Sequence, residues 1–246
     1  MASISNNEIK KVKSLQQKKF RDEEGLFIAE GDKMLEEAER SRFHVECVYR
    51  RDSIGEEAMK RISALASPSP VLAVIRKPSD AYVDDISSLK GLISEGGLFL
   101  ALDTIRDPGN LGTIIRIADW FGIKAIFAAK DTVDVFNPKV VQATMGALSR
   151  VKVHYCDLNE SLKKLSSDIP IYGTFLDGEN IYTQELSPNG VIIMGNEGRG
   201  ISHDIAKCVT KKILVPSYPH DRPTSESLNV AVATSIVCAE FRRRLQ

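Results

Sequence analysis

Residues 192–201, IIMGNEGRGI, have the residue types of a ligand-binding loop. An apolar run breaks there into three glycines, with Asn196, Glu197 and Arg199 between them. Glycine has no Cβ, so backbone N–H groups in such a loop can approach a ligand closely. The spacing G-x-x-G-x-G differs from the dinucleotide and P-loop fingerprints, and Glu197 would repel a bound phosphate. Taken alone, the loop is equally typical of a surface turn between a strand and a helix.

A second polar stretch, residues 103–122, reads DTIRDPGNLGTIIRIADWFG. Its Pro-Gly pair predicts a turn, and Asn110 is expected to cap the helix that follows. On that helix Arg116 lies on the same flank as Gly112, away from the apolar stripe, and the bare glycine would leave room for a substrate. The alternative is an ordinary surface ion pair between Arg116 and Asp119.

The third stretch, residues 215–236, reads VPSYPHDRPTSESLNVAVATSI. Its prolines are expected to hold the first part extended, and the helix after it is rich in small residues. Ser225 or Ser227 is expected to cap this helix, with Asn229 about one turn inside and facing a site. The small side chains permit close packing, either against a second copy of the chain or within one copy.

The elements around these stretches must bring them together. Strands are expected at residues 98–105, 125–130, 151–156, 171–176, 191–195 and 211–216, with helical segments between most of them. This alternation predicts an α/β fold whose mostly parallel sheet is covered by helices on both faces. Ligands of such sheets bind at the carboxyl ends of the strands, where all three polar stretches begin. A smaller α/β unit is expected before residue 78, followed by a linker to about residue 95.

Charge is balanced over the whole chain but not along it. The 33 Lys and Arg match the 33 Asp and Glu, so no global field favours a nucleic acid. Residues 1–22 carry a net charge of +4, which suits a polyanion such as RNA and is also typical of a solvated helix end. The candidate RNA contacts are Lys10, Lys11, Lys13, Lys18 and Lys19, with Arg21 beside them.

Cysteines and histidines give no sign of a metal site. The four of each are scattered, with no C-x-x-C and no pair at metal-ligand spacing, so we expect no metal and reduced thiols. No apolar run is long enough to span a membrane, and the first residues lack the apolar core of a secretion signal. These features favour a cytoplasmic protein without a membrane partner.

Together the three stretches are more specific than any one of them. The segments NLGTIIR, IIMGNEGRGI and ESLNVAVATSI resemble, in order and spacing, the three signature motifs of the SpoU (TrmH) family of RNA ribose 2′-O-methyltransferases in the SPOUT superfamily. The resemblance covers residues 97–246 and includes residues 137–153 between motifs. Residues 8–77 resemble the L30e/L7Ae-like RNA-binding domain of that family.

The resemblance implies a domain organisation and partners. It places an L30e-like RNA-binding domain with its linker at 1–92 and a SPOUT methyltransferase domain at 93–246, whose chain forms a deep trefoil knot. It also implies ribosomal or transfer RNA as the substrate, and a homodimer with the active site near the subunit interface.

The resemblance also implies S-adenosylmethionine as the cofactor. Its adenine and methionine parts need backbone donors and acceptors more than a phosphate cradle, which removes the objection raised by Glu197. The residues that match cofactor-binding positions are Gly195, Val215 and Leu228, with Thr174, Asn196 and Gly198 nearby.

Arg116 matches the arginine of the first motif, which in the family is assigned to the ribose 2′-hydroxyl. Because a guanidinium cannot be deprotonated in proteins, we expect Arg116 to bind the RNA phosphate and the 2′-oxygen and to stabilise developing negative charge there. A phosphate or a water would take the proton, and no metal is needed. The other polar motif positions, expected to orient ribose, arginine and cofactor, are Asn110, Glu197, Ser227 and Asn229.

One stretch departs from the family pattern, and two other functions stay open. Before SLN this chain has residues 217–224, a segment longer than the family pattern by about four residues and without the glycine of that pattern. His220 and Arg222 are expected to add a wall or an RNA contact there. The second hypothesis is a catalytically silent RNA-binding or ribosome-assembly protein of the same fold. The third, an NAD(P) or nucleotide enzyme, lacks the required glycine spacing after its first strand.

Overall fold

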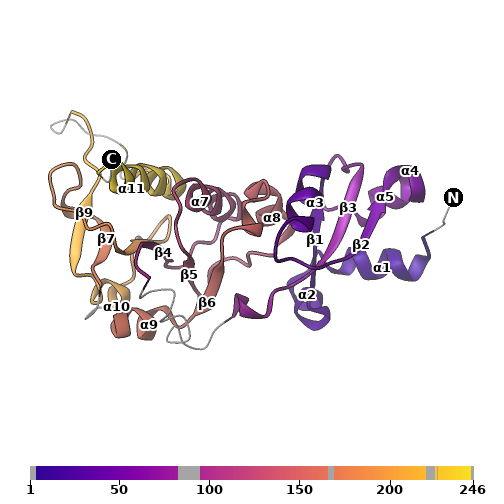
Figure 1. Ribbon diagram of the computed structural model, residues 1–246, viewed down its shortest axis with the longest axis horizontal. Coiled ribbons are helices and arrows are strands. Elements are labelled where there is room, and N and C mark those ends of the chain that lie inside the picture. The colour runs from indigo at the N-terminus through magenta and orange to yellow at the C-terminus, as the bar shows by residue number, and fades with distance from the viewer. Residues whose placement is uncertain (1–3, 83–94, 166–168, 220–224, 226, 245–246) are drawn as a thin grey trace. The chain divides into compact units, whose positions relative to one another are not determined.

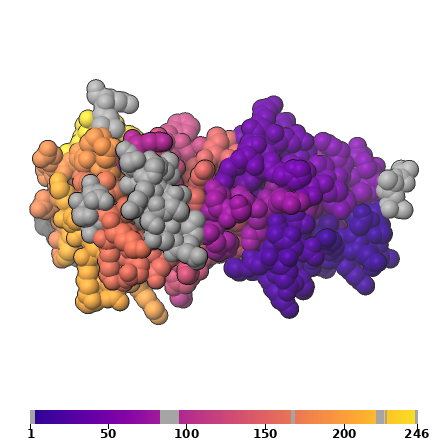
Figure 2. All heavy atoms as spheres, turned by 60° about the horizontal axis from the view of Figure 1, so that its bottom comes forward, coloured from indigo at the N-terminus to yellow at the C-terminus, as the bar shows by residue number. Residues whose placement is uncertain are grey.

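The computed structural model describes residues 4–82, 95–165, 169–219, 225 and 227–244. The chain divides into two compact units, the first formed by Met1–Ser79 with Asp134–Arg150 and the second by Asp80–Val133 with Val151–Gln246. Figure 1 labels the elements and colours them by position along the chain. In Figure 2 the indigo to violet atoms, which belong to the N-terminal part of the first unit, form one compact body. The domain boundary predicted at residue 92 lies outside the described residues.

The first unit is built on a three-stranded antiparallel sheet in the order β1-β3-β2. Helix α1 packs against it through buried Ile9 and Val12, and Ser5 starts that helix in a capping box with Glu8. The elements of this unit are α1 (Asn6–Ser14), α2 (Lys18–Glu24), β1 (Leu26–Glu30), α3 (Asp32–Glu39), β2 (Val45–Arg50), α4 (Arg51–Ile54), α5 (Glu56–Ile62), β3 (Val71–Arg76), α8 (Pro138–Thr144) and η3 (Ala147–Ser149).

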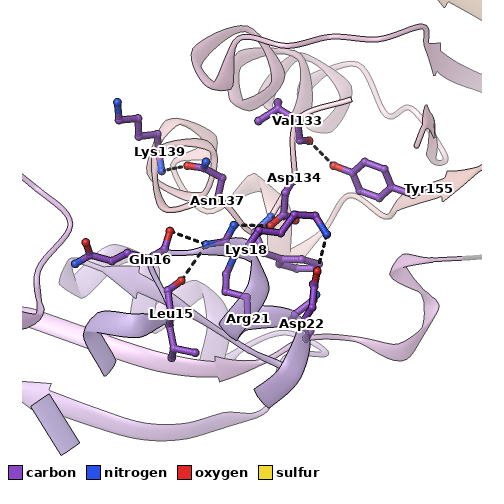
Figure 3. Close-up of polar contacts among 12 residues, drawn as sticks. Leu15, Gln16, Lys18, Arg21, Asp22, Val133, Asp134, Asn137, Lys139 and Tyr155 are labelled. Atoms are coloured by element: carbon purple, nitrogen blue, oxygen red, sulfur yellow. Dashed lines mark hydrogen bonds and ion pairs between the residues drawn. The ribbon is translucent and has the colours of Figure 1, made fainter. Parts of the chain in front are cut away.

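A buried ion pair fastens residues 134–150 into this unit (Figure 3). Arg21 is only 1% exposed; its Nη2 lies 2.6 Å from Oδ2 of Asp134, and its Nη1 donates to the carbonyls of Leu15 and Gln16. The paired geometry and the extra hydrogen bonds are what a charged group needs when it leaves water. Arg21 is therefore a core residue, and its grouping with the exposed lysines as an RNA contact was wrong.

The second unit is built on a six-stranded parallel sheet in the order β6-β5-β4-β8-β7-β9. All six predicted strands are present, which confirms the α/β fold class with a mostly parallel sheet. The elements of this unit are β4 (Leu98–Leu102), α7 (Pro108–Trp120), β5 (Ile126–Ala129), β6 (Val153–Cys156), α9 (Leu158–Leu165), β7 (Ile171–Asn180), β8 (Gly190–Met194), α10 (His203–Ala206), β9 (Lys211–Leu214) and α11 (Val230–Arg243), with η1 (Ser79–Ala81) where the unit begins.

Helices cover both faces of this sheet (Figure 1). Helix α7 packs along α11 on one face, while α9 and α10 contact each other on the opposite face. Strands β4 and β8 are buried along their whole lengths, so both read as continuous apolar runs. This arrangement carries the ends of β4 and β8 and the start of α11 to one edge of the sheet.

Two helices begin at residues other than those predicted. Asp107, not Asn110, caps α7, because its carboxylate accepts the backbone N–H of Asn110 at 2.7 Å and Pro108 follows as the first helical residue. Asn229, not Ser225 or Ser227, caps α11 through Oδ1, which accepts from the N–H groups of residues 231 and 232. In both cases the capping residue is the polar residue that directly precedes the first residue of the helix.

Candidate active site

The ends of β7, β8 and β9 and the start of α11 enclose a pocket of about 370 Å³. The glycine loop lines this pocket with polar atoms, and an apolar wall is formed by Phe175, Leu176 and Ile213. A pocket of this size with mixed lining is typical of a small-molecule site. The residues that match family cofactor positions all line it, namely Thr174, Gly195, Asn196, Gly198, Val215 and Leu228, together with Glu197 and Ser227.

The glycine loop after β8 is a tight, closed turn. Asn196 and Gly200 exchange two backbone hydrogen bonds of 2.9 Å, and Gly200 has the left-handed φ of +68° that favours glycine. A Cβ on Gly195 would overlap the backbone of Gly200 and Ile201, so two backbone segments touch there. Gly195 is thus required by a close approach within the chain, which also brings the loop backbone to the pocket wall.

Asn196 uses its whole side-chain amide inside the protein. Its Nδ2 donates to the carbonyl of Thr104 at 2.8 Å, and its Oδ1 accepts from the N–H groups of Gly198 and Arg199 at 3.0 and 3.1 Å. The amide therefore joins the loop after β8 to the loop after β4. Although Asn196 lines the pocket, these bonds make it a positioning residue for both loops.

A chain of three polar side chains joins the three motifs. Asn229 Nδ2 donates to Asn110 Oδ1 at 2.9 Å, and Asn110 Nδ2 donates to Glu197 Oε1 at 3.1 Å. Each amide is fixed in direction by its partners, so Asn110 presents its NH₂ group to Glu197. The structure thus brings three of the five predicted catalytic residues into one hydrogen-bonded row, and Ser227 lies on the adjacent pocket wall.

Arg116 stands apart from this row. It is exposed on α7, it is not part of the pocket lining, and it makes no ion pair or side-chain hydrogen bond within the described residues. The surface ion pair with Asp119, considered as the alternative, is not formed. The room expected above Gly112 is not there either, because Gly112 is buried in the packing of α7.

The five predicted RNA-binding lysines are all exposed on α1 and α2 or beside them. Lys11 pairs with Glu24 at 3.0 Å, Lys18 with Asp22 at 2.6 Å and Lys19 with Glu23 at 3.9 Å. Lys10 and Lys13 make no such pair within the part of the chain that the structure describes. His220 and Arg222, predicted to extend the pocket wall, lie outside the described residues.

Sequence reasoning missed the residues that hold the loop after β4. Asp103 is buried, and its Oδ2 accepts the N–H of Ser202 at 2.7 Å. Thr104 has a left-handed φ of +61°, which is strained for a residue with a branched Cβ. An acidic residue directly after a buried strand was the available signal for Asp103, whereas nothing local predicts the conformation of Thr104.

The described residues offer neither a metal-ligand cluster nor a membrane-spanning helix. Among the described residues, no group of three or more His, Cys, Asp and Glu side chains is arranged to hold a metal ion. No helix in the same residues combines the length and hydropathy needed to cross a bilayer.

Family models match most of the chain. Residues 97–239 match the SpoU rRNA Methylase family, and residues 6–77 match the MRM3-like substrate binding domain. The chain belongs to the SpoU rRNA methylase family. The resemblance drawn from the three motifs is therefore confirmed, and with it the prediction of an RNA ribose 2′-O-methyltransferase that uses S-adenosylmethionine.

Relatives with names and structures cover nearly the full length. The chain is 29% identical to the 23S rRNA (guanosine(2553)-2′-O)-methyltransferase RlmP of Bacillus subtilis, over 98% of each chain. A putative RNA methyltransferase of the TrmH family from Porphyromonas gingivalis is 36% identical, with a TM-score of 0.81, over 99% of this chain and 100% of the other. The AdoMet-bound rRNA methyltransferase of Sinorhizobium meliloti is 27% identical, with a TM-score of 0.86, over 100% and 98%.

Proposed function

We propose that this protein transfers the methyl group of S-adenosylmethionine to a ribose 2′-oxygen of ribosomal RNA at the pocket between β7, β8, β9 and α11. The observation that carries the proposal is the convergence of the three motifs: one pocket lined by the residues matching cofactor positions, and beside it the row Asn229, Asn110 and Glu197. Ribosomal RNA is the substrate named for the full-length relatives that the chain resembles.

The pocket lining fits the cofactor. Backbone groups of the glycine loop and of Val215 can bind the polar parts of S-adenosylmethionine, and Leu228 and Ile213 can pack on its apolar surface. When bound, S-adenosylmethionine supplies an activated methyl group on a positively charged sulfur. Asn196 holds the loop backbone in place, Gly195 permits the close contact of the loop with Gly200 and Ile201, and Gly198 leaves open space beside the loop.

The polar residues then position the ribose. Glu197 accepts a hydrogen bond from Asn110, and its carboxylate can accept one from a ribose hydroxyl. Arg116 binds the RNA phosphate and the 2′-oxygen and stabilises the negative charge that develops as the oxygen attacks. The proton of the hydroxyl leaves to a phosphate or a water, because the guanidinium cannot accept it.

The first unit captures structured RNA through its lysines, with Lys10 and Lys13 the two that have no acidic partner in the described residues. Contacts between lysines and phosphates make the RNA affinity fall as the salt concentration rises. The double variant Lys10→Glu, Lys13→Glu should therefore bind RNA more weakly and with a shallower dependence on salt. A salt titration of RNA binding checks this assignment. A cytoplasmic location is part of the same proposal, and the resemblance to bacterial rRNA methyltransferases supports it.

We assign the exposed apolar face of α7 and α11 to a homodimer contact. Trp120 is 85% exposed one turn after Arg116, and Val232 is 50% exposed near the start of α11. Leu228, which is 48% exposed, lies just before α11 and lines the pocket. Exposed apolar surface that leads into a site is typical of an interface, and a second copy there would bring Arg116 toward an active site. The trefoil knot belongs to the same proposal, as a feature of the family fold.

The decisive experiment measures transfer of label from radioactive S-adenosylmethionine to unmodified ribosomal RNA, for the wild type and for Arg116→Ala. We expect label on a ribose 2′-oxygen with the wild type and at least a hundredfold slower transfer with the variant, since a lost charge-stabilising donor costs roughly 10²–10³ in rate. Both proteins should bind S-adenosylmethionine equally in calorimetry, because Arg116 does not line the pocket. Cofactor binding without any transfer to RNA would instead favour the silent RNA-binding protein.

A further inference from the structure

The arginines of the second unit fall into two groups. Those at the end of α11 are engaged: Arg242 donates to the carbonyls of Phe121 and Gly122, and the next two residues pair with Glu240. The others that the structure describes, Arg106, Arg116 and Arg199, are exposed and make no ion pair or side-chain hydrogen bond within the described residues. Arg116 already has a place in the proposed reaction, while Arg106 and Arg199 do not.

The side-chain amide of Asn196 links the two loops that carry Arg106 and Arg199. Arg106 follows Thr104 by two residues, and the carbonyl of Thr104 accepts from Asn196 Nδ2 at 2.8 Å. The backbone N–H of Arg199 donates to Oδ1 of the same amide at 3.1 Å. One side chain therefore fixes the backbones that carry both arginines, and Arg199 is itself part of the pocket wall.

The nearby carboxylate does not neutralise either arginine. Glu197 lies between Asn196 and Arg199 in sequence, yet its two oxygens accept from the amides of Asn110 and Asn196 at 3.1 and 3.4 Å. Both carboxylate oxygens of Glu197 thus accept from asparagine amides, and neither makes an ion pair with a guanidinium in the described residues. Two planar five-donor groups are left facing solvent, and this geometry matches a phosphate oxygen pair.

We propose that Arg106 and Arg199 bind backbone phosphates of the substrate RNA on the two sides of the target ribose. The occupant is RNA rather than a protein because two unpaired guanidinium groups complement the charge of successive phosphates. Contacts on both sides would fix the register of the strand at the pocket, so that one ribose is presented to Glu197 and Arg116. The inference rests on the proposed function, since it takes the pocket to be the site of methylation.

The test compares the wild type with Arg106→Ala, Arg199→Ala and the double variant. A matched control is Lys163→Ala, which removes one exposed positive charge from α9 in the same unit, away from the pocket lining. The probe is unmodified 23S rRNA transcribed in vitro, and its dissociation constant is measured between 50 and about 200 mM salt, the range over which phosphate contacts are resolved. Methyl transfer, S-adenosylmethionine binding and melting temperature are measured on the same samples.

We expect each arginine variant to weaken RNA binding roughly tenfold, the loss of one charged hydrogen-bonded contact. The slope of log K against log salt should fall by about 0.7 to 0.9 for each arginine removed. At limiting RNA the rate of methylation falls by the same factor and recovers at saturating RNA, while the melting temperature stays unchanged. Cofactor binding stays unchanged in Arg106→Ala, because Arg106 does not line the pocket. Lys163→Ala should resemble the wild type in all of these measurements.

The inference is overturned if both variants bind RNA with the wild-type affinity and salt slope, or if Lys163→Ala reduces them equally. RNA binding is measured without turnover, so this result is independent of the proposed activity. A wild type that binds RNA through both arginines but transfers no methyl group would refute the proposed function and leave the phosphate contacts standing. Charge reversal, Arg106→Glu with Arg199→Glu, should enlarge the loss, which a purely structural effect on the loops would not require.

Discussion

Asn229 does two separate things with one amide. Its Oδ1 caps α11 by accepting two backbone N–H groups, and its Nδ2 donates to Asn110 in the row that ends at Glu197. A cap contributes about 1 kcal/mol to stability, whereas the donated hydrogen bond fixes the direction of the Asn110 amide. The sequence analysis placed Asn229 inside the helix and facing a site. It therefore predicted the functional role of this residue and missed its role as the helix cap.

Asn229→Asp separates the two roles. Its carboxylate still accepts from the first N–H groups of α11 and favours the positive end of the helix dipole, so the free energy of unfolding should stay within about 0.5 kcal/mol of the wild type. The donor to Asn110 is lost, and a like-charged carboxylate now sits in the row with Glu197, so methyl transfer should fall at least tenfold. Urea unfolding and single-turnover methylation measure the two effects.

Asn229→Ala is the matched comparison, because it removes the cap and the donor together. It should lose about 1 kcal/mol of stability as well as activity. If the aspartate variant kept full activity, the row would be an ordinary surface network with no part in catalysis.

At the scale of elements, the local sequence pattern predicted where strands and helices occur. It did not predict the residues at which the helices begin. The strands of the second unit were predictable because most of them, such as β4, β5 and β8, are short apolar runs bounded by turn residues. The caps Asp107 and Asn229 were not predicted, because more than one polar residue stands near each helix start. The sequence pattern alone does not choose between such residues. The placement of residues 134–150 with the first unit depends on Arg21 and Asp134, 113 residues apart, which no local pattern connects.

The site shows the same division. The pocket residues could be assigned because three motifs matched a family at once, although each motif alone was weak. The use of Asn196 as a link between two loops could not be predicted, because its partner is the carbonyl of Thr104 in a left-handed conformation. Arg106 and Arg199 became candidates only when the structure showed what they do not contact.

The end of α11 carries a pH-dependent contribution to stability. Glu240 is buried, and hydrogen bonds from Arg243 and then Arg244 lower its pKa from 4.5 to about 2. A lowered pKa in the folded state means that the carboxylate stabilises the fold above the unfolded pKa, and this stability is lost as pH falls from about 4.5 to about 2. Arg244 also donates to the carbonyls of Ile181 and Gln184, so the pair anchors the helix to the segment after β7.

Glu240→Gln should therefore destabilise the protein by roughly 2–3 kcal/mol at pH 7, with a difference that shrinks to roughly half at pH 3 and approaches zero only below about pH 2. Urea unfolding of both proteins at pH 7, 4 and 3 measures this. Glu160→Gln, at an exposed pair with Lys163 on α9, is the control and should change stability by less than about 0.5 kcal/mol at each pH. A difference for Glu240→Gln that does not depend on pH would mean that packing, not charge, accounts for the loss.

At the scale of the whole molecule, the proposed role of Arg116 in catalysis requires that this residue meet a pocket that it does not line. Arg116 does not line the pocket of its own chain, and α7 presents it beside Trp120 on an exposed apolar face. An interface of standard size buries about 800 Å² on each partner, with aromatic residues near its centre. We propose that a second copy on this face buries Trp120 and places Arg116 of one copy at the boundary with a pocket of the other.

Trp120→Glu tests this arrangement. A charge at the centre of a buried apolar contact should shift the protein from dimer to monomer in size-exclusion chromatography with light scattering, and methyl transfer should fall with the dimer fraction. Binding of S-adenosylmethionine should be retained to within a few-fold, because the pocket lining contains neither Trp120 nor Arg116. Tyr182→Glu is the control, since Tyr182 is also an exposed aromatic of this unit but belongs to the segment after β7 and not to α7 or α11. A Trp120→Glu protein that stays dimeric and active would place the interface elsewhere, and Arg116 would then have to reach the ribose from its own chain.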